Sequence, residues 1–303
     1  MADMTADPVA APSVPVPMMS GLAALAPRYD AFILDLWGTL HDGVAPLPGA
    51  VDALERLKAV EKRVLILSNA PRRIAPVIAR MRRLGIADGL TDAVLSSGEA
   101  AWLGLRDRPD DWHRGLGRAC YLIGAAGDDS VISGLDLTRV GNIAEAEFIV
   151  CVGLAGPGET VADYEPVLTA AAARRLPMIC ANPDIEVLRG GVRELCAGAL
   201  ARRYRALGGD VREHGKPHAP IYRLALARLG GIAPTRVLAI GDSLTTDIAG
   251  AAAAGMDSLL VTGGIHAEAL GLADLEPPNP DRLAALCAET GCWPSAAIAA
   301  FRW

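Results

Sequence analysis

Short, unbroken apolar runs alternate with longer amphipathic stretches along this chain. Three of the runs, at 32–34, 64–67 and 237–241, stop at a residue with a carboxylate or hydroxyl side chain. These residues are Asp35, Ser68 and Asp242. Apolar runs of this length are typical of parallel strands that are buried on both faces. Ligands of parallel sheets bind beyond the carboxyl ends of the strands, so the pattern predicts a site formed by these polar residues.

The order of the elements predicts the fold class. We expect strands at 31–35, 64–68, 93–95, 236–241 and 258–261, and helices at 50–60, 72–84, 192–207, 218–229 and 247–254. Such alternation of strands and helices is typical of a doubly wound parallel sheet. A middle block has its own pattern, with strands expected at 119–124, 147–153 and 177–181 and a helix at 160–175. The sequence therefore predicts an α/β protein in which a second α/β domain interrupts the core.

The same pattern sets the expected domain boundaries. Residues 1–20 are rich in Ala, Pro, Val and Met, and we expect them to form a disordered tail. The core is expected to comprise residues 21–98 and 199–303, and the inserted domain residues 99–198.

Composition narrows the class of protein. Of the 303 residues 51% are apolar and 21% charged, which is typical of a soluble globular protein. No apolar run approaches the roughly 18 residues that span a bilayer, so no membrane partner is expected. A net charge of −6 and 4% aromatic residues argue against nucleic acid. Six cysteines without a C-x-x-C pair or an export signal indicate a reducing, cytoplasmic compartment.

Three carboxylates suggest a metal site. Asp35 and Asp242 follow strands, and Asp247 lies five residues after Asp242 across a strand-to-helix turn. Carboxylates at neighbouring strand ends repel one another unless a cation lies between them. Mg²⁺ prefers a few carboxylate oxygens together with water and phosphate. Asp247 has an alternative role as a helix-start residue that the helix dipole stabilises.

Other residues suggest a site for an anion. Gly38 and Thr39 follow Asp35 in a tight turn whose N–H groups can bind an anion. Ser68 offers a hydroxyl, and Lys216, between Gly215 and Pro217, offers a positive charge just before a helix. A carboxylate nucleophile, a hydroxyl, an ammonium and a metal around one anion are typical of phosphoryl transfer.

Four motifs, in this order, resemble those of the haloacid dehalogenase (HAD) superfamily. Asp35-Leu36-Trp37-Gly38-Thr39-Leu40 is similar to its first motif, D-x-D-G-T-[LV], and Leu67-Ser68-Asn69 to the second. Lys216-Pro217 is similar to the third motif, and the segment from Gly241 to Asp247 to the fourth. The resemblance covers about residues 28–290. It implies a Rossmann-like doubly wound parallel sheet core with an inserted α/β cap domain.

The block between the second and third motifs is similar to the C2-type cap of subgroup IIA, which includes nucleotide and 4-nitrophenyl phosphatases. Ala181-Asn182-Pro183-Asp184 resembles that subgroup's [TA]-N-P-D segment, and Gly215-Lys216-Pro217 has its usual form. The resemblance makes Asn182 and Asp184 candidate substrate contacts, with a structural Asx turn as the alternative. Because such caps often lie at dimer interfaces, a homodimer is also expected.

The resemblance implies a role for each motif residue. Asp35 would attack phosphorus and form an aspartyl-phosphate, with Lys216 as the second catalytic residue. Mg²⁺ would be bound by Asp35, the backbone carbonyl of Trp37, Asp242 and Asp247. The phosphoryl oxygens would be held by Gly38, Thr39, Ser68, Asn69 and Lys216.

Trp37 departs from the family pattern, because phosphatases of the family have there an Asp that protonates the leaving group and then activates water. Loss of a general acid or base commonly costs about 10²–10⁴ in rate. Three explanations are open. The substrate's leaving group needs no proton, or a nearby residue such as His41 or Asp42 replaces the acid. In the third, the chain binds its ligand without turnover.

The leading prediction is an Mg²⁺-dependent hydrolase of a small phosphorylated metabolite. Cleavage of a carbon–halogen or carbon–phosphorus bond is the first alternative, because other members of the superfamily also lack the second acid. A catalytically weak phosphometabolite-binding protein is the second. The sequence does not identify the substrate.

Overall fold

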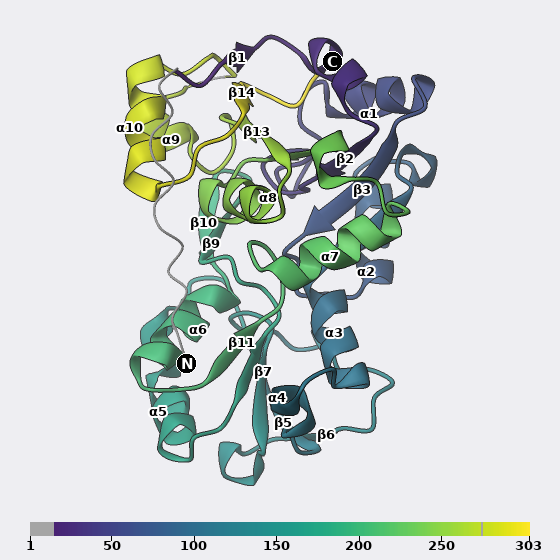
Figure 1. Ribbon diagram of the computed structural model, residues 1–303. Helices are drawn as coiled ribbons and strands as arrows, with labels where there is room; N and C mark the ends of the chain where they lie inside the picture. The colour runs from purple at the N-terminus through teal and green to yellow at the C-terminus, as the bar shows by residue number, and fades with distance from the viewer. Residues whose placement is uncertain (1–14, 274) are drawn as a thin grey trace. The chain divides into compact units, whose positions relative to one another are not determined.

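The computed structural model describes residues 15–273 and 275–303, which form two compact units (Figure 1). The described residues of the first unit are 15–67, 84–93, 222–273 and 275–303. The second unit comprises residues 68–83 and 94–221. Among the described residues, no helix combines the length and the apolar character needed to cross a membrane.

A seven-stranded sheet contains the strands of the first unit; of its edge strand β4, only Ala93 belongs to that unit. Its strands, in spatial order, are β1 (Met18–Met19), β14 (Ala296–Ile298), β13 (Asp257–Val261), β12 (Val237–Gly241), β2 (Ala31–Leu34), β3 (Arg63–Ser68) and β4 (Ala93–Ser96). The pairs from β1 to β3 are all parallel. Leu34 pairs with both Ile240 and Ile66, so β2, β12 and β3 end at the same edge of the sheet.

Helices accompany these strands, as the alternation predicts. They are α1 (Ala50–Ala59), α7 (Ala219–Arg228), α8 (Ala249–Ala253), α9 (Ala267–Leu270) and α10 (Pro280–Thr290). A π-helical turn, η7 (Leu244–Ile248), precedes α8. One apolar cluster joins Leu244 and Ile248 of η7 to Leu260 of β13 and to Leu283 and Cys287 of α10. The turn between β12 and α8 is thereby anchored in the core.

The second unit has a separate parallel sheet. Its strands, in spatial order, are β11 (Val211–Glu213), β8 (Met178–Cys180), β7 (Phe148–Cys151), β5 (Ala119–Ile123) and β6 (Thr138–Val140). An antiparallel pair, β9 (Glu186–Arg189) and β10 (Val192–Leu195), stands apart from this sheet. The helices are α2 (Ile74–Arg83), α3 (Ser97–Asp107), α4 (Asp111–Arg114), α5 (Glu165–Ala173) and α6 (Ala197–Ala206).

Both faces of this second sheet are covered. Ile149 and Cys151 of β7 pack in a cluster with residues of α5 and α6. Phe148 and Val150, which point to the opposite face, pack with Ala101 and Leu105 of α3. Successive side chains of a strand alternate between faces, so a continuous apolar run is buried on both. Two parallel sheets with helices confirm the α/β fold class.

The helix predicted over 192–207 is wrong in its first part. Val192–Leu195 form β10, and the helix α6 begins only at Ala197. Gly190 and Gly191, with φ of 53° and 80°, make the turn between β9 and β10. Two consecutive left-handed residues form the type of turn that closes a tight hairpin, and glycine adopts them without strain.

Two other segments differ from the predicted pattern. Helix α3 follows β4 directly, where no helix was expected, with the Ser96 side chain accepting a hydrogen bond from the N–H of Glu99 as its N-cap. Residues 1–14 of the predicted tail lie outside the described residues, but Met18–Met19 form β1. The predicted boundary between core and cap stays a prediction.

Candidate active site

Three carboxylates of the first unit gather beyond the ends of β2 and β12. Asp35 follows β2, Asp242 follows β12, and Asp247 lies in η7. One oxygen of each carboxylate lies within 4.8 Å of the others, and all three residues are buried. Three negative charges so close repel one another strongly unless a cation lies among them. Buried oxygen ligands of this kind fit a hard divalent cation such as Mg²⁺.

Backbone groups fix two of these carboxylates. Oδ2 of Asp242 accepts a hydrogen bond from the N–H of Ile265 at 2.8 Å, and Oδ2 of Asp247 accepts one from Ser243 at 3.2 Å. A Cβ on Gly38 would lie 1.8 Å from Oδ2 of Asp242, and one on Gly264 would lie 2.2 Å from it. The chain therefore has glycine where its backbone passes closest to Asp242.

The turn after Asp35 carries a buried hydroxyl. The N–H of Gly38 donates to the carbonyl of His41, and the N–H of Leu40 donates to that of Leu36. Thr39 is fully buried, and its Oγ1 has no hydrogen-bond partner among the described residues. A buried hydroxyl without a hydrogen-bond partner destabilises the folded protein, so its presence needs an explanation. A phosphoryl oxygen at this turn would supply the missing hydrogen bond.

Trp37 is held against the loop that follows. A Cβ on Gly43 would lie 2.2 Å from Cζ3 of the indole, so the ring packs directly on this glycine. The imidazole of His41 meets the indole edge to face, with ring centroids 4.9 Å apart. Isolated bridges join Trp37 to His41 and His41 to Pro46. The indole is thereby part of a small, closed loop.

The two predicted substitutes for the missing acid have structural roles in this loop. Nδ1 of the buried His41 accepts a hydrogen bond from the N–H of Gly43 at 3.0 Å. Oδ1 of Asp42 accepts from Val44 and from Ala45, each at 2.8 Å. Hydrogen bonds from the backbone, that of Ala45 first, lower the pKa of Asp42 below its usual value. Asp42 is therefore ionised more completely than an ordinary carboxyl group and carries a proton for a leaving group less often.

In the second unit, Asn69 connects two predicted site segments. Its Oδ1 accepts from the N–H of Lys216 at 2.8 Å, and its Nδ2 donates to the carbonyl of Lys216 at 3.1 Å. The same Nδ2 donates to Oδ1 of Asp184 at 2.8 Å. Both Asn69 and Lys216 are buried. The amide of Asn69 thus fixes the backbone on both sides of the Lys216 side chain.

Asn182 and Asp184 form the Asx turn that the sequence leaves open as an alternative. Oδ1 of Asn182 accepts from the N–H of Asp184 at 3.1 Å. This turn holds the carboxylate of Asp184 where it accepts from Asn69. Their candidate role as substrate contacts stays a prediction.

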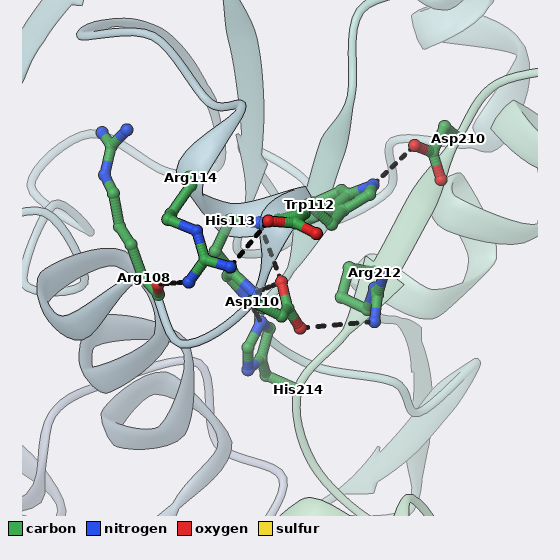
Figure 2. A network of polar contacts seen from close by, with 9 residues as sticks. Arg108, Asp110, Trp112, His113, Arg114, Asp210, Arg212 and His214 are labelled. Atoms are coloured by element: carbon green, nitrogen blue, oxygen red, sulfur yellow. Dashed lines mark hydrogen bonds and ion pairs between the residues drawn. The ribbon is translucent and has the colours of Figure 1, made fainter.

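The residues just before Lys216 belong to a polar network (Figure 2). Nε2 of His214 lies 3.3 Å from Nε2 of His113, and Nδ1 of His113 lies 2.7 Å from Oδ1 of Asp110. Oδ2 of Asp110 lies 3.8 Å from Nη1 of Arg212, so this carboxylate reaches both α4 and the segment 211–214 (Figure 2). The network therefore ties α4 to the chain that leads into Lys216.

Burial shapes the charges of this segment. Burial, followed by the like charges of His113 and Arg212, lowers the pKa of His214 to about 3. Burial alone would raise the pKa of Glu213, but its hydrogen bonds with His218 and Arg205 outweigh it and hold the value at about 2. At neutral pH His214 is neutral and Glu213 is charged.

The predicted site residues thus fall into two groups. In the first unit, the structure places Asp35, Trp37, Gly38 and Thr39 on one turn and brings Asp35 together with Asp242 and Asp247. In the second, it joins Asn69, Asp184 and Lys216. Ser68 is fully buried at the end of β3, where its Oγ accepts from the N–H of Ala70 at 3.2 Å.

Sequence reasoning missed the segment after β13 that carries Gly264 and Ile265. This segment contacts Asp242 through a close backbone approach and one hydrogen bond. The signal was the pair Gly263-Gly264, separated by one residue from a predicted strand, because glycine in or near a strand often marks a close backbone approach.

Two family models match this chain. A haloacid dehalogenase-like hydrolase model matches residues 32–138, and a HAD-hydrolase-like model matches residues 213–289. A solved structure of a haloacid dehalogenase-like hydrolase from Brucella suis is 35% identical, with a TM-score of 0.80. That likeness covers 93% of this chain and 99% of the Brucella chain.

Two further similarities are to phosphatases of Mycobacterium tuberculosis. A D-glycerol 3-phosphate phosphatase is 27% identical over 248 residues, which cover 81% of this chain and 66% of the relative's length. A glycerol phosphate phosphatase solved in complex with magnesium is 25% identical, with a TM-score of 0.66. This second likeness covers 92% of this chain and 76% of that one.

Proposed function

Because the chain belongs to the haloacid dehalogenase-like hydrolase family, we propose that it hydrolyses a small phosphorylated metabolite with the help of Mg²⁺. It is a phosphoric monoester hydrolase of the HAD type, like the phosphatases to which it is similar. The cluster of Asp35, Asp242 and Asp247 is the observation that carries the proposal. Its three buried carboxylates provide both a nucleophile and ligands for a cation.

The metal would be held by Asp35, Asp242 and Asp247, with the backbone carbonyl of Trp37. When bound, Mg²⁺ supplies positive charge that offsets the negative charge of the carboxylates and of the phosphoryl group. One similar phosphatase was solved with magnesium, which supports this choice of cation. Gly38, Gly264 and Ile265 limit the position of Asp242 and so orient its carboxylate.

The remaining motif residues would bind the phosphoryl group. Asp35 would attack phosphorus and form an aspartyl-phosphate, which water then hydrolyses. Thr39 has a buried hydroxyl without a partner among the described residues, which supports its role as a donor to a phosphoryl oxygen. The other phosphoryl contacts would come from Gly38, Ser68, Asn69 and Lys216. The cap at 99–198, the homodimer and the cytoplasmic location stay predictions.

Two alternatives differ in their need for a metal. The buried carboxylate cluster argues against carbon–halogen cleavage, because the L-2-haloacid dehalogenases of the superfamily need no metal. A binding protein without turnover is favoured by one observation, the indole of Trp37 where family phosphatases have an acid. Such a protein would bind a phosphometabolite in the presence of Mg²⁺ and release no phosphate.

The test is a phosphometabolite screen with Mg²⁺ and with EDTA, on the wild type and on Asp35→Asn. We expect phosphate release from a subset of compounds that needs both Mg²⁺ and Asp35. Hydrolysis that survives EDTA would favour the dehalogenase type of chemistry. Hydrolysis that survives Asp35→Asn would show that the nucleophile is another residue.

A further inference from the structure

The turn that carries Asp35 offers no ready proton donor for a leaving group. We propose that this phosphatase acts on phosphorylated compounds whose leaving group departs as a stable anion, namely aryl phosphates and acyl phosphates. The inference rests on the proposed function and names the class of its substrate. Its basis is the arrangement of three side chains on one loop of the first unit: Trp37, His41 and Asp42.

Trp37 cannot donate a proton to a leaving oxygen. Its only polar group is an indole N–H, which donates hydrogen bonds but does not ionise in water. The ring packs on Gly43 and against the edge of His41, so the loop is built around an indole at this place. A carboxylate in the same position would leave the space above Gly43 empty.

His41 stabilises the loop through a hydrogen bond from the backbone. Its Nδ1 accepts the N–H of Gly43 at 3.0 Å, so the proton of the neutral ring lies on Nε2. A proton added to Nδ1 would point at that N–H group and break the hydrogen bond. Since His41 is only 1% exposed, water cannot readily replace the lost contact. His41 is therefore suited to donate a hydrogen bond, and not to transfer a proton.

Asp42 also accepts hydrogen bonds from the backbone of the loop. Its Oδ1 accepts hydrogen bonds from two backbone N–H groups, those of Val44 and Ala45, and such bonds favour the charged carboxylate over the protonated acid. A carboxylate that is already ionised has no proton to give. None of the three side chains is therefore arranged to protonate a leaving oxygen.

The consequence follows from the chemistry of the first step. An oxygen of Asp35 bonds to phosphorus, and the bond from phosphorus to the leaving oxygen breaks. The leaving group takes the electron pair and departs as an anion. An aliphatic alkoxide is a poor leaving group, because its parent alcohol is about as weak an acid as water. A phenol, with a pKa of about 10, or a carboxylic acid, at about 4, departs far more easily. In the second step water attacks phosphorus, Asp35 is released, and the water's proton passes to solvent.

The experiment compares esters of similar shape that differ in their leaving group. We expect the wild type with Mg²⁺ to hydrolyse phenyl phosphate with a kcat/KM at least about 10²-fold above that for benzyl phosphate, the loss typical of a missing general acid. Acetyl phosphate tests the acyl class. Equal kcat/KM values for phenyl and benzyl phosphate would overturn the inference, and would point to a proton donor elsewhere in the chain.

Two variants sharpen the comparison. Trp37→Asp is expected to raise kcat/KM for benzyl phosphate relative to phenyl phosphate, whereas Trp37→Phe should keep the wild-type ratio. Because the ratio compares two substrates on one protein, a partly misfolded variant does not distort it. If neither ester, nor acetyl phosphate, nor any compound of the phosphometabolite screen is hydrolysed, the proposed function itself fails. If both esters are hydrolysed equally and Asp35→Asn abolishes this, only the inference fails.

Discussion

Gly38 and Asp242 lie so close that no other residue fits at position 38. A Cβ there would lie 1.8 Å from Oδ2 of Asp242, and the φ of 70° at Gly38 is itself unfavourable for other residues. The two residues are 204 positions apart in the sequence, and their contact limits how near the turn after Asp35 can approach the carboxylate of Asp242.

Gly38→Ala should therefore displace Asp242 and weaken metal binding. We expect kcat/KM to fall by about 10² or more, since a shift of about 1 Å can cost that much. Gly255→Ala is the matched control, because Gly255 has a φ of 71° and nothing within 4 Å of its added Cβ. The control shares the backbone strain and should keep the Mg²⁺ dependence of activity. Equal losses in both variants would contradict the role of this contact.

Removal of one negative charge should stabilise the metal-free protein. Asp247→Asn relieves repulsion among three carboxylates within 4.8 Å, which is worth roughly 1–4 kcal/mol per close pair. Thermal unfolding in EDTA should show a higher Tm for the variant than for the wild type. Mg²⁺ should raise the Tm of the wild type by binding its folded state, and that of the variant much less. Glu289→Gln, at an exposed position, should change neither result.

Asn69→Ala should loosen the segment around Lys216. The substitution leaves the N–H of Lys216 and the carboxylate of Asp184 without their observed partner, and an unmet buried group costs about 1–3 kcal/mol. Hydrogen exchange should show faster exchange at the amide of Lys216. Asp184→Asn is the control: it keeps the two hydrogen bonds between Asn69 and Lys216, so the amide of Lys216 should exchange as slowly as in the wild type. Unchanged exchange in Asn69→Ala would contradict the bridging role.

The lowered pKa of His214 should make the stability of the folded protein depend on pH. Its pKa is lowered from the usual 6.5 to about 3, so between these values the unfolded chain binds a proton that the folded chain does not. The folded state is therefore favoured by this residue at pH 7 and loses that stabilisation as the pH falls from about 6.5 towards 3. His214→Gln should show a smaller fall in Tm between pH 6.5 and 4.5 than the wild type. An identical fall would show that the folded state protonates His214 readily.

Much of the first unit was predictable because its strands are apolar runs that end at polar residues. Strands β2, β3 and β12 lie within one residue of their predicted bounds, and the acidic cluster follows from the meeting of their ends. The hairpin at 186–195 was missed because Arg193 and Glu194 suit an exposed helix as well as an exposed strand. Only its glycine turn distinguishes the two.

Details of the site that depend on packing could not be predicted. Both Gly38 and Gly264 lie against Asp242, although Gly38 is distant from the other two residues in the sequence. Likewise, nothing in the sequence near Trp37 shows that His41 turns its Nδ1 towards Gly43. Local patterns specify strands and motifs, whereas the orientation of a side chain depends on tertiary contacts.

The strand order also determines when the acidic cluster can form during synthesis on the ribosome. Strand β2 lies between β3, which follows soon after it, and β12, which is made about 200 residues later. Most residues of the second unit have emerged before β12 is translated. A nascent chain that stops before β12 has Asp35 but neither Asp242 nor Asp247. The acidic cluster can therefore form only after Asp247 has been translated.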